Sequence, residues 1–203
     1  MLIVFDFMDD FSKMREFGRH YWPSERMQIE AIQSSDLIVA VTKVLLEKAR
    51  QHGKPAVLIP NGVRFEDFVG PYEPHPMLRA FSPPVIGFLG TFGSWIDIDL
   101  LCAVAEEFPD ALIVFVGNVL SDVKRLQQFS NVHFVKSVPY PEVPAVLVAF
   151  DVCLNPFDMK QPVSSGVSPL KLYEYLAAGK LVVSTWMHDL ERVADVVYVA
   201  HNK

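Results

Sequence analysis

Lys171 and Glu174 stand three positions apart in the stretch "SPLKLYEYLAAGK", and their types and spacing suit them to chemistry. A lysine in the first turn of a helix opposes the helix dipole at a cost of about 0.3–1 kcal/mol, similar in size to the gain from an i,i+3 ion pair with Glu174. Two interpretations remain open. The side chains form a solvated ion pair, or Lys171 and the helix N-terminus bind a phosphate while Glu174 accepts hydrogen bonds from sugar hydroxyls.

The helix that carries these two residues has clear end signals. Ser168 is a suitable N-cap, Pro169 fits the first helical position and Gly179 fits the position after the last turn, so the pattern predicts a helix over residues 169–178. At 100° per residue, one stripe holds Lys171, Glu174, Tyr175 and Ala178. The other side, expected to face the core, holds Leu170, Leu172, Tyr173, Leu176 and Ala177.

Three glycines spaced three apart run out of a predicted strand and towards a helix in "GFLGTFGSWIDIDLL". They are Gly87, Gly90 and Gly93, and Thr91 lies between the last two. Glycine lets the backbone approach a ligand closely, and the next helix N-terminus offers N–H groups to a phosphate. The spacing matches neither G-x-G-x-x-G nor a P-loop, so a tight turn that packs the helix is the alternative.

The next two strand ends are further candidates for ligand contacts. Gly117 closes the run "LIVFVG", where turn formation alone is the alternative. In "VHFVKSVPY", the backbone from Val135 to Val138 is expected to be exposed and able to bracket a flat ring such as a nucleobase.

The elements that must position these residues alternate between strand and helix. Short β-branched runs predict strands at residues 2–5, 37–42, 56–60, 85–90, 112–117, 132–135, 151–156, 181–185 and 196–200. Helical patterns lie between most of them, as in "SERMQIEAIQSS", "KVLLEKARQHG", "DIDLLCAVAEEF" and "LSDVKRLQQF". The alternation predicts an α/β fold with a Rossmann-like, doubly wound parallel sheet and right-handed crossovers. Ligands of such sheets bind beyond the carboxyl ends of the strands, where the candidate residues fall.

The alternation is interrupted at residues 63–84, which hold five prolines and no periodicity. We expect a linker there. Residues 85–203 contain six predicted strands, enough for a nearly complete doubly wound domain. Residues 1–62 contain only three, so this part is expected to belong to a larger domain or to pack on the second one.

Composition excludes several classes of function. The net charge of the 203 residues is −6, which argues against nucleic-acid binding. Cys102 and Cys153 sit in apolar runs without metal-ligand spacing, so we expect reduced core cysteines and a cytoplasmic protein. The longest apolar run is broken by Pro144 and Asp151 and is too short to span a membrane.

The N-terminal part holds a basic aromatic stretch and an acidic cluster. The stretch "MDDFSKMREFGRHYWPSER" could rest on an anionic membrane surface or form a solvated segment with buried aromatic residues. Asp6, Asp9 and Asp10 lack a second group of ligands, so we expect no metal site there.

The order and spacing of these motifs resemble the GT-B fold glycosyltransferases of the large group 1 type, which are family 4-like and use nucleotide-sugar donors. The resemblance rests on "IPNGV", "IGFLGTFGSWIDIDLL", "VHFVKSVPYPEVPAVLVAFDVCLNPF" and "SPLKLYEYLAAGKLVVST", and covers nearly all of residues 35–190. It implies that residues 85–203 are a C-terminal donor-binding domain without its closing helices. Residues 1–62 would be the last portion of the N-terminal, acceptor-side Rossmann-like domain, preceded in the full domain by roughly a hundred residues.

The resemblance also implies roles for single residues. Glu174 matches the second glutamate of the family's E-x7-E pattern, which holds the donor ribose or sugar, whereas the first falls on Gly166. The loop before the helix would instead offer backbone N–H groups and hydroxyls from Ser165, Gly166, Val167 and Ser168. The family's basic residues are missing from Thr91–Trp95, which leaves Lys171 to neutralise the diphosphate. The expected donor site also includes Gly90, Thr91, Gly93, Gly117 and Val135.

The function implied by the resemblance is transfer of a hexosyl-type sugar from a nucleotide-diphosphate sugar to a glycan or lipid-linked acceptor, with retention and without a metal or other cofactor. Lys171 and Glu174 are the expected catalytic residues. The expected setting is polysaccharide or cell-envelope glycan synthesis in the cytoplasm, with peripheral contact at the inner membrane face. This chain alone is expected to bind the donor weakly without turnover. A non-catalytic nucleotide-sugar binding module and a nucleotide-sugar epimerase of the same fold remain as alternatives.

Overall fold

The computed structural model describes residues 1–13, 25–81, 84–161, 164 and 166–200. The chain forms two compact units. Unit 1 comprises Met1–Asn61, Met159–Pro169 and Met187–Val193. Unit 2 comprises Gly62–Asp158, Leu170–Trp186 and Ala194–Lys203. Two segments that follow residue 85 in the sequence therefore pack with the N-terminal part of the chain.

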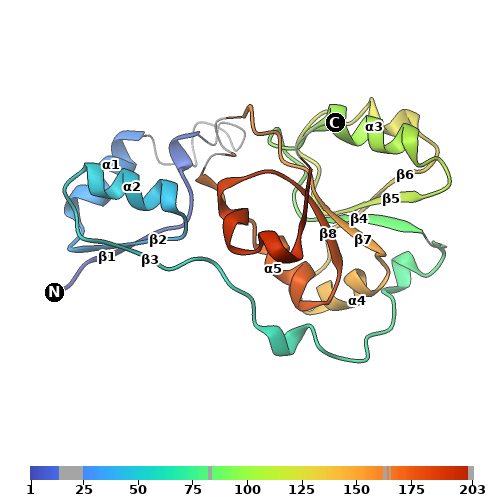
Figure 1. Ribbon diagram of the computed structural model, residues 1–203, viewed down its shortest axis with the longest axis horizontal. Helices are drawn as coiled ribbons and strands as arrows, with labels where there is room; N and C mark the ends of the chain where they lie inside the picture. Colours follow the sequence, from blue (N-terminus) through green and yellow to red (C-terminus); the bar gives the residue numbers. More distant parts are fainter. Residues whose placement is uncertain (14–24, 82–83, 162–163, 165, 201–203) are drawn as a thin grey trace. The chain divides into compact units, whose positions relative to one another are not determined.

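Unit 1 is built on a three-stranded parallel sheet with the strand order β1-β2-β3. Its elements are β1 (Val4–Phe7), α1 (Glu25–Ser34), β2 (Leu37–Ala40), α2 (Lys43–Gln51) and β3 (Ala56–Leu58). Both helices lie on the same side of the sheet (Figure 1), because both right-handed crossovers step in the same direction. The core between them includes Phe7, Ile32, Ile38 and Leu45, all fully buried.

Unit 2 is built on a six-stranded parallel sheet with the order β6-β5-β4-β7-β8-β9. The strands are β4 (Val85–Leu89), β5 (Leu112–Val116), β6 (Val132–Val135), β7 (Val152–Asn155), β8 (Leu181–Thr185) and β9 (Tyr198–Ala200). The helices are α3 (Ile98–Glu107), α4 (Val143–Val148) and α5 (Leu170–Ala177). Short 3₁₀ turns cover Phe11–Lys13, Phe65–Asp67, Pro76–Leu78, Leu126–Gln128, Tyr140–Glu142, His188–Arg192 and Ala194–Val196.

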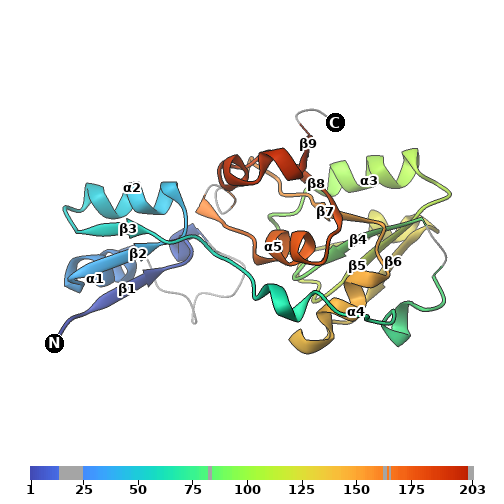
Figure 2. The ribbon, with the colours of Figure 1, turned by 60° about the horizontal axis from the view of Figure 1, so that its bottom comes forward.

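The helices of unit 2 cover both faces of its sheet, with α3 on one side and α4 and α5 on the other (Figures 1 and 2). The chain runs outward from β4 to β5 and β6 and then returns to the other side of β4 through β7. The predicted α/β fold with a doubly wound parallel sheet is thereby confirmed. The direction of winding reverses between β4 and β7, and the crevice at such a reversal is where open α/β sheets bind ligands.

One predicted helix is absent. Residues 120–129 were expected to be helical, but they form only the 3₁₀ turn Leu126–Gln128. The N–H of Lys124 bonds to the side chain of Asp122 at 3.0 Å. Such a local side-chain bond competes with the first turn of a helix, so the prediction from periodicity was wrong here.

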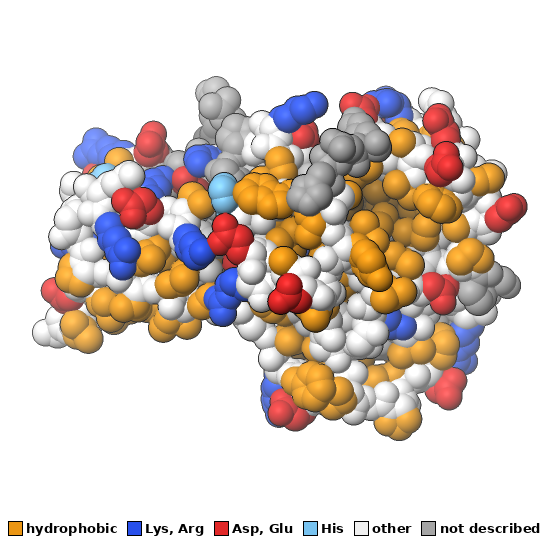
Figure 3. All heavy atoms as spheres, in the orientation of Figure 1, with side chains coloured by type: hydrophobic (Ala, Val, Ile, Leu, Met, Phe, Trp, Pro, Cys, Tyr) orange, Lys and Arg blue, Asp and Glu red, His pale blue; other side chains and the backbone are white. Residues whose placement is uncertain are grey.

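On the face of the sheet that carries α3, the strands β7, β8 and β9 are only partly covered by other side chains. Strand register aligns Val152 with Leu181 and Val183 with Tyr198, so the members of each pair lie on the same side. Val152 and Val183 contact the core cluster that includes residues of α3, whereas Leu181 is 58% exposed and Tyr198 is 68% exposed. We call Val152, Leu181, Val183 and Tyr198 the apolar strip. Figure 3 shows hydrophobic side chains gathered on the surface of unit 2.

Candidate functional site

The predicted site residues at three strand ends are neighbours in the structure. Gly90 follows β4, Gly117 follows β5 and Val135 ends β6. The N–H of Gly90 donates a hydrogen bond to the carbonyl oxygen of Val116 at 2.9 Å. The N–H of Gly117 donates one to the carbonyl oxygen of Val135 at 3.1 Å. These three residues therefore form one continuous edge at the carboxyl ends of the sheet.

Glycine is required at Gly117 for two separate reasons. Its φ is +151°, and a Cβ atom there would lie 2.0 Å from the carbonyl oxygen of Gly90. Gly90 also has a positive φ, of +123°. Any larger residue at Gly117 would push the two strand ends apart.

Lys171 reaches this edge from the first turn of α5. Its ammonium nitrogen lies 4.5 Å from the ring centroid of Phe88, in β4, and 5.4 Å from that of Phe157, just after β7. A Cβ atom on Gly90 would be 3.0 Å from Lys171 Cε and 3.2 Å from Nζ. The lysine therefore lies between the ends of β4 and β7, where the winding of the sheet reverses.

The environment of Lys171 is apolar. Burial lowers the pKa of its ammonium from 10.5 to about 8, and the nearby Glu174 opposes this only in part. Within the part of the chain that the structure describes, no ion pair joins Lys171 to Glu174 or to another carboxylate. Lys171 instead makes cation–π contacts, which favour the charged form but do not neutralise it. The structure thus lacks the solvated ion pair that was one interpretation of this spacing.

Glu174 lies one turn further along α5 and is half-buried. Burial raises the pKa of its carboxyl group, and the positive charge of Lys171 lowers it. Tyr140 is close enough for the charge of Glu174 to raise the pKa of the phenol, after the larger effect of burial. Motif reasoning missed Tyr140, although its place just after the strand end "VHFV" could have indicated it.

Thr91 and Gly93 belong to the loop after β4, as expected. Phe92, between them, is buried and donates its N–H to the carbonyl of Asn118 at 2.7 Å. A Cβ atom on Gly93 would lie 2.5 Å from the ring of Trp95. The indole therefore packs directly on Gly93, so close packing explains this glycine without a ligand.

The loop before α5 differs in part from the prediction. The helix begins at Leu170, one residue later than expected, and the Ser168 hydroxyl donates to Asp189 at 2.7 Å. Gly166, Val167 and Ser168 belong to unit 1, whereas the chain from Leu170 to Trp186 belongs to unit 2. Ser165 lies outside the described residues.

Two positions on α5 were assigned to the wrong side of the helix. Tyr175 is fully buried, and its hydroxyl accepts a hydrogen bond from the N–H of Leu89 at 2.8 Å. Leu170, expected in the core, is 54% exposed. The bond to the end of β4 satisfies the phenol inside the core, which the helical stripe could not indicate.

None of the described helices is long and apolar enough to cross a membrane. Most of the basic aromatic stretch, at residues 14–24, lies outside the described residues.

Solved structures with a similar fold include one in complex with a nucleotide sugar. The Anabaena protein Alr3699/HepE, crystallised in complex with UDP-glucose, matches 98% of this chain and 58% of its own with a TM-score of 0.72 at 15% identity. Sucrose-phosphate synthase from Thermosynechococcus elongatus matches 97% of this chain and 54% of its own with a TM-score of 0.67 at 16% identity. At these identities the likeness shows the fold, which is the expected GT-B type.

Sequence comparison identifies the family. A putative teichuronic acid biosynthesis glycosyltransferase, TuaH, of Bacillus subtilis (strain 168) is 29% identical over 182 residues, which cover 85% of this chain and 45% of the relative. The chain therefore spans about half the length of this curated relative. Residues 83–200 match the family described as "Glycosyl transferases group 1". The chain belongs to the group 1 glycosyltransferases.

Proposed function

We propose that unit 2 carries the donor-binding machinery of a glycosyltransferase that uses a nucleotide-diphosphate sugar. The observation that carries the proposal is the half-buried ammonium of Lys171, which lies over two aromatic rings at the winding reversal of the sheet and has no ion-pair partner among the described residues. A positive charge held in an apolar site gains most from a ligand that brings negative charge. A diphosphate does so, and UDP is the first nucleotide to test because HepE was crystallised with it.

The residues around Lys171 receive roles in this proposal. Lys171 and the N–H groups at the start of α5 bind the diphosphate. Glu174 accepts hydrogen bonds from the ribose or sugar hydroxyls. Gly90 and Gly117 keep the strand ends free of side chains, and Thr91 adds a hydroxyl beside them.

The proposed reaction places negative charge where these groups are. The bond between the sugar C1 and the diphosphate oxygen breaks, an acceptor hydroxyl oxygen bonds to C1, and the leaving diphosphate takes up the charge. Donors fixed before the reaction stabilise such a charge without reorganisation, and losing one of them typically slows a reaction by about 10²–10³-fold. In this proposal the sugar is a hexose transferred with retention, without a metal or other cofactor.

The acceptor side is proposed by analogy with the relative. The name of TuaH places that protein in teichuronic acid biosynthesis. We infer that this chain serves cell-envelope polysaccharide synthesis, with a glycan or lipid-linked acceptor presented at the cytoplasmic face of the membrane. Because the chain covers 45% of TuaH, we expect it to bind the donor without completing the transfer by itself.

A non-catalytic nucleotide-sugar binding module is the second candidate. It is favoured by Gly166, which stands where the family pattern has a carboxylate near the transferred sugar. A transfer assay with UDP-sugars and a mixed glycan acceptor, on this chain extended to the length of its relatives, separates the two functions. Product formation supports the transferase, and tight UDP binding without product supports the module.

Calorimetry with UDP tests the donor site. Lys171→Ala is expected to weaken UDP binding at least about tenfold, because a charge-assisted contact to phosphate is lost, and Glu174→Ala is expected to weaken it by about fivefold. Lys124→Ala is the matched control, since this lysine is 84% exposed and forms an ion pair with Asp122. Binding that neither Lys171→Ala nor Glu174→Ala affects would refute the site.

A further inference from the structure

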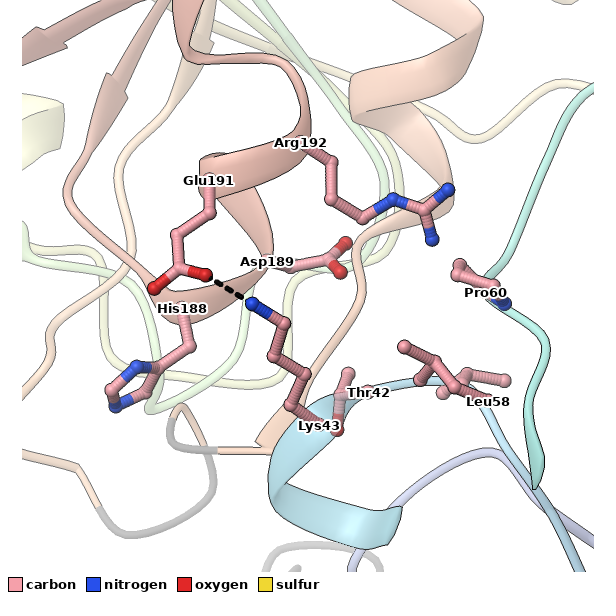
Figure 4. Close-up of a pocket in the computed structure, with 9 residues that line it drawn as sticks. Thr42, Lys43, Leu58, Pro60, His188, Asp189, Glu191 and Arg192 are labelled. Carbon is pink, nitrogen blue, oxygen red and sulfur yellow. Dashed lines mark hydrogen bonds and ion pairs between the residues drawn. The ribbon is translucent and has the colours of Figure 1, made fainter. Parts of the chain in front are cut away.

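The partners of two lysines in this chain differ in kind. In unit 1, Lys43 pairs with Glu191, and Figure 4 shows the two side chains directed at each other. In unit 2, the ammonium nitrogen of Lys171 lies over aromatic rings instead, 4.5 Å from the ring centroid of Phe88 and 5.4 Å from that of Phe157. One lysine thus has a carboxylate partner and the other has two ring faces.

Both rings at Lys171 are held firmly within unit 2. The Phe88 side chain is 1% exposed and packs edge-on against Phe92, with the ring centroids 6.0 Å apart. Phe157 is 4% exposed, and its carbonyl oxygen accepts a hydrogen bond from Thr185 Oγ1 at 2.8 Å. Phe88 lies in β4 and Phe157 follows β7, and these strands are neighbours in the sheet. The two rings therefore hold the ammonium group near the ends of β4 and β7.

Gly90 leaves the space that the lysine side chain occupies. A Cβ atom there would lie 3.0 Å from Lys171 Cε and 3.2 Å from Nζ. The contacts to Lys171 from β4, from the residue after β4 and from the residue after β7 thus come from Phe88, Gly90 and Phe157, none of which titrates. Glu174, on the same helix, is the carboxylate whose charge acts on the ammonium. The two rings and the glycine do not neutralise the charge of Lys171.

An aromatic partner and a carboxylate partner have different consequences for binding an anion. The negative face of an aromatic ring stabilises an ammonium group and offsets part of the cost of its burial. Because the ring has no net charge, the positive charge stays available to a phosphate, whereas a carboxylate would compete with that ligand. Burial lowers the pKa of Lys171 to about 8, and the ring contacts oppose this fall because they favour the charged form.

We propose that Phe88 and Phe157 are positioning residues for Lys171. Their rings hold its ammonium group at the ends of β4 and β7, keep it charged, and leave that charge to the phosphates of the ligand. The inference rests on the proposed function, because it assigns Lys171 the same diphosphate. Both phenylalanines belong to apolar stretches of the sequence, where packing in the core is the ordinary role of this residue type.

The titration of Lys171 in the ligand-free, 203-residue chain tests the contact itself. It is followed by the NMR signal of the Lys171 Cε carbon, which is assigned by its absence from Lys171→Arg. Replacing Phe157 with 4-fluorophenylalanine and then with 3,4,5-trifluorophenylalanine withdraws electrons from the ring face with little change in shape. The midpoint is expected to fall stepwise, by about half a pH unit for the trifluorinated ring. The same replacements at Phe150, which is 1% exposed and packs on Gly87, are the matched control and should not move the midpoint.

Calorimetry with UDP, inorganic pyrophosphate and uridine tests the consequence for binding. Phe157→Leu is expected to raise the Kd for UDP and for pyrophosphate about threefold at neutral pH, because the ammonium loses a ring contact. Uridine binding should stay unchanged, since the effect passes through Lys171 and reaches only the phosphates. The pH at which UDP affinity falls should also move downward. Phe150→Leu is the control and should change none of these quantities.

Thermal melting of each variant separates positioning from folding. If Phe157→Leu does not melt cooperatively, the fluorinated rings decide, because they preserve the packing. A Lys171 midpoint that does not respond to fluorination at position 157, or equal losses for uridine and UDP in a folded Phe157→Leu chain, would overturn the inference. A parent chain that does not bind UDP would contradict the proposed function itself, whereas unchanged UDP binding in all variants would contradict only the positioning role.

Discussion

Lys171 is the residue whose surroundings say most about ligand binding. Its ammonium lies over Phe88 and Phe157, and burial brings its pKa down to about 8. The pKa of Lys171 is therefore lower in the folded chain, at about 8, than its ordinary value of 10.5. Lys171 loses its proton more readily in the folded chain than in the unfolded one. A bound diphosphate reverses this effect, because negative charge nearby favours the ammonium form.

Affinity for UDP should therefore fall as the pH rises through about 8. Below that pH, Lys171 already carries its positive charge in the free chain. Above that pH, Lys171 is neutral in the free chain and must take up a proton when UDP binds, which weakens the binding. Lys171→Arg keeps its charge over this range and should show a flat profile between about pH 7 and about pH 9. Titration calorimetry in buffers of different ionisation enthalpy measures both the Kd and the proton uptake. Parallel slopes for the parent chain and Lys171→Arg would show that Lys171 does not bind the phosphates.

Gly117 supports the same site through the backbone. A side chain there meets both an unfavourable φ of +151° and the carbonyl oxygen of Gly90 at 2.0 Å. Gly117→Ala should lower the free energy of unfolding by at least about 2 kcal/mol. Gly62→Ala is the control, because a Cβ atom there has nothing within 4 Å, and it should change stability by less than about 0.5 kcal/mol. Equal urea midpoints for the two variants would contradict the strained geometry.

At the scale of elements, local pattern predicted the strands better than the helices. Eight of the nine β-branched runs contain a whole strand, and the first, residues 2–5, overlaps β1 only at its start, because β1 continues to Phe7. Strands buried on both faces need continuous apolar residues, which makes such runs easy to recognise. The helix expected over residues 120–129 failed where Asp122 bonds to the backbone locally. The helix α5 ends as expected, since Gly179 has a φ of +67° and Lys180 N–H bonds back to the carbonyl of Tyr175 at 2.9 Å.

The candidate site shows where such predictions stop. Gly90, Gly117 and Lys171 could be identified because each directly follows a strand or opens a helix in the sequence. The hydrogen bonds that join Ser168 to Asn61 and to Asp189 could not be predicted, since they span 107 and 21 positions of the chain. The burial of Tyr175 likewise depends on a bond to Leu89, 86 positions away. Contacts of this kind are set by packing between elements and leave no local pattern.

For the molecule as a whole, the order of the strands explains both the position of Lys171 and the exposure of the apolar strip. Lys171 lies at the reversal between β4 and β7, and the same reversal sends α3 to one face of the sheet and α4 and α5 to the other. No described helix follows β8 on the α3 side, so the apolar strip remains partly exposed. Parallel sheets normally have both faces covered, so we predict that this strip promotes self-association of the chain.

Neighbouring residues on β8 provide the test, because successive side chains in a strand point to opposite faces. Leu181 is 58% exposed and Val182 is fully buried on the other face. Leu181→Ser combined with Tyr198→Ser should reduce concentration-dependent light scattering and binding of a hydrophobic dye, while changing stability by less than about 1 kcal/mol. Val182→Ser should lower the free energy of unfolding by about 2–4 kcal/mol, because it opens a cavity and buries a hydroxyl. Unchanged scattering in the double variant would mean that the strip does not drive self-association, and a mild effect of Val182→Ser would contradict the assignment of the two faces.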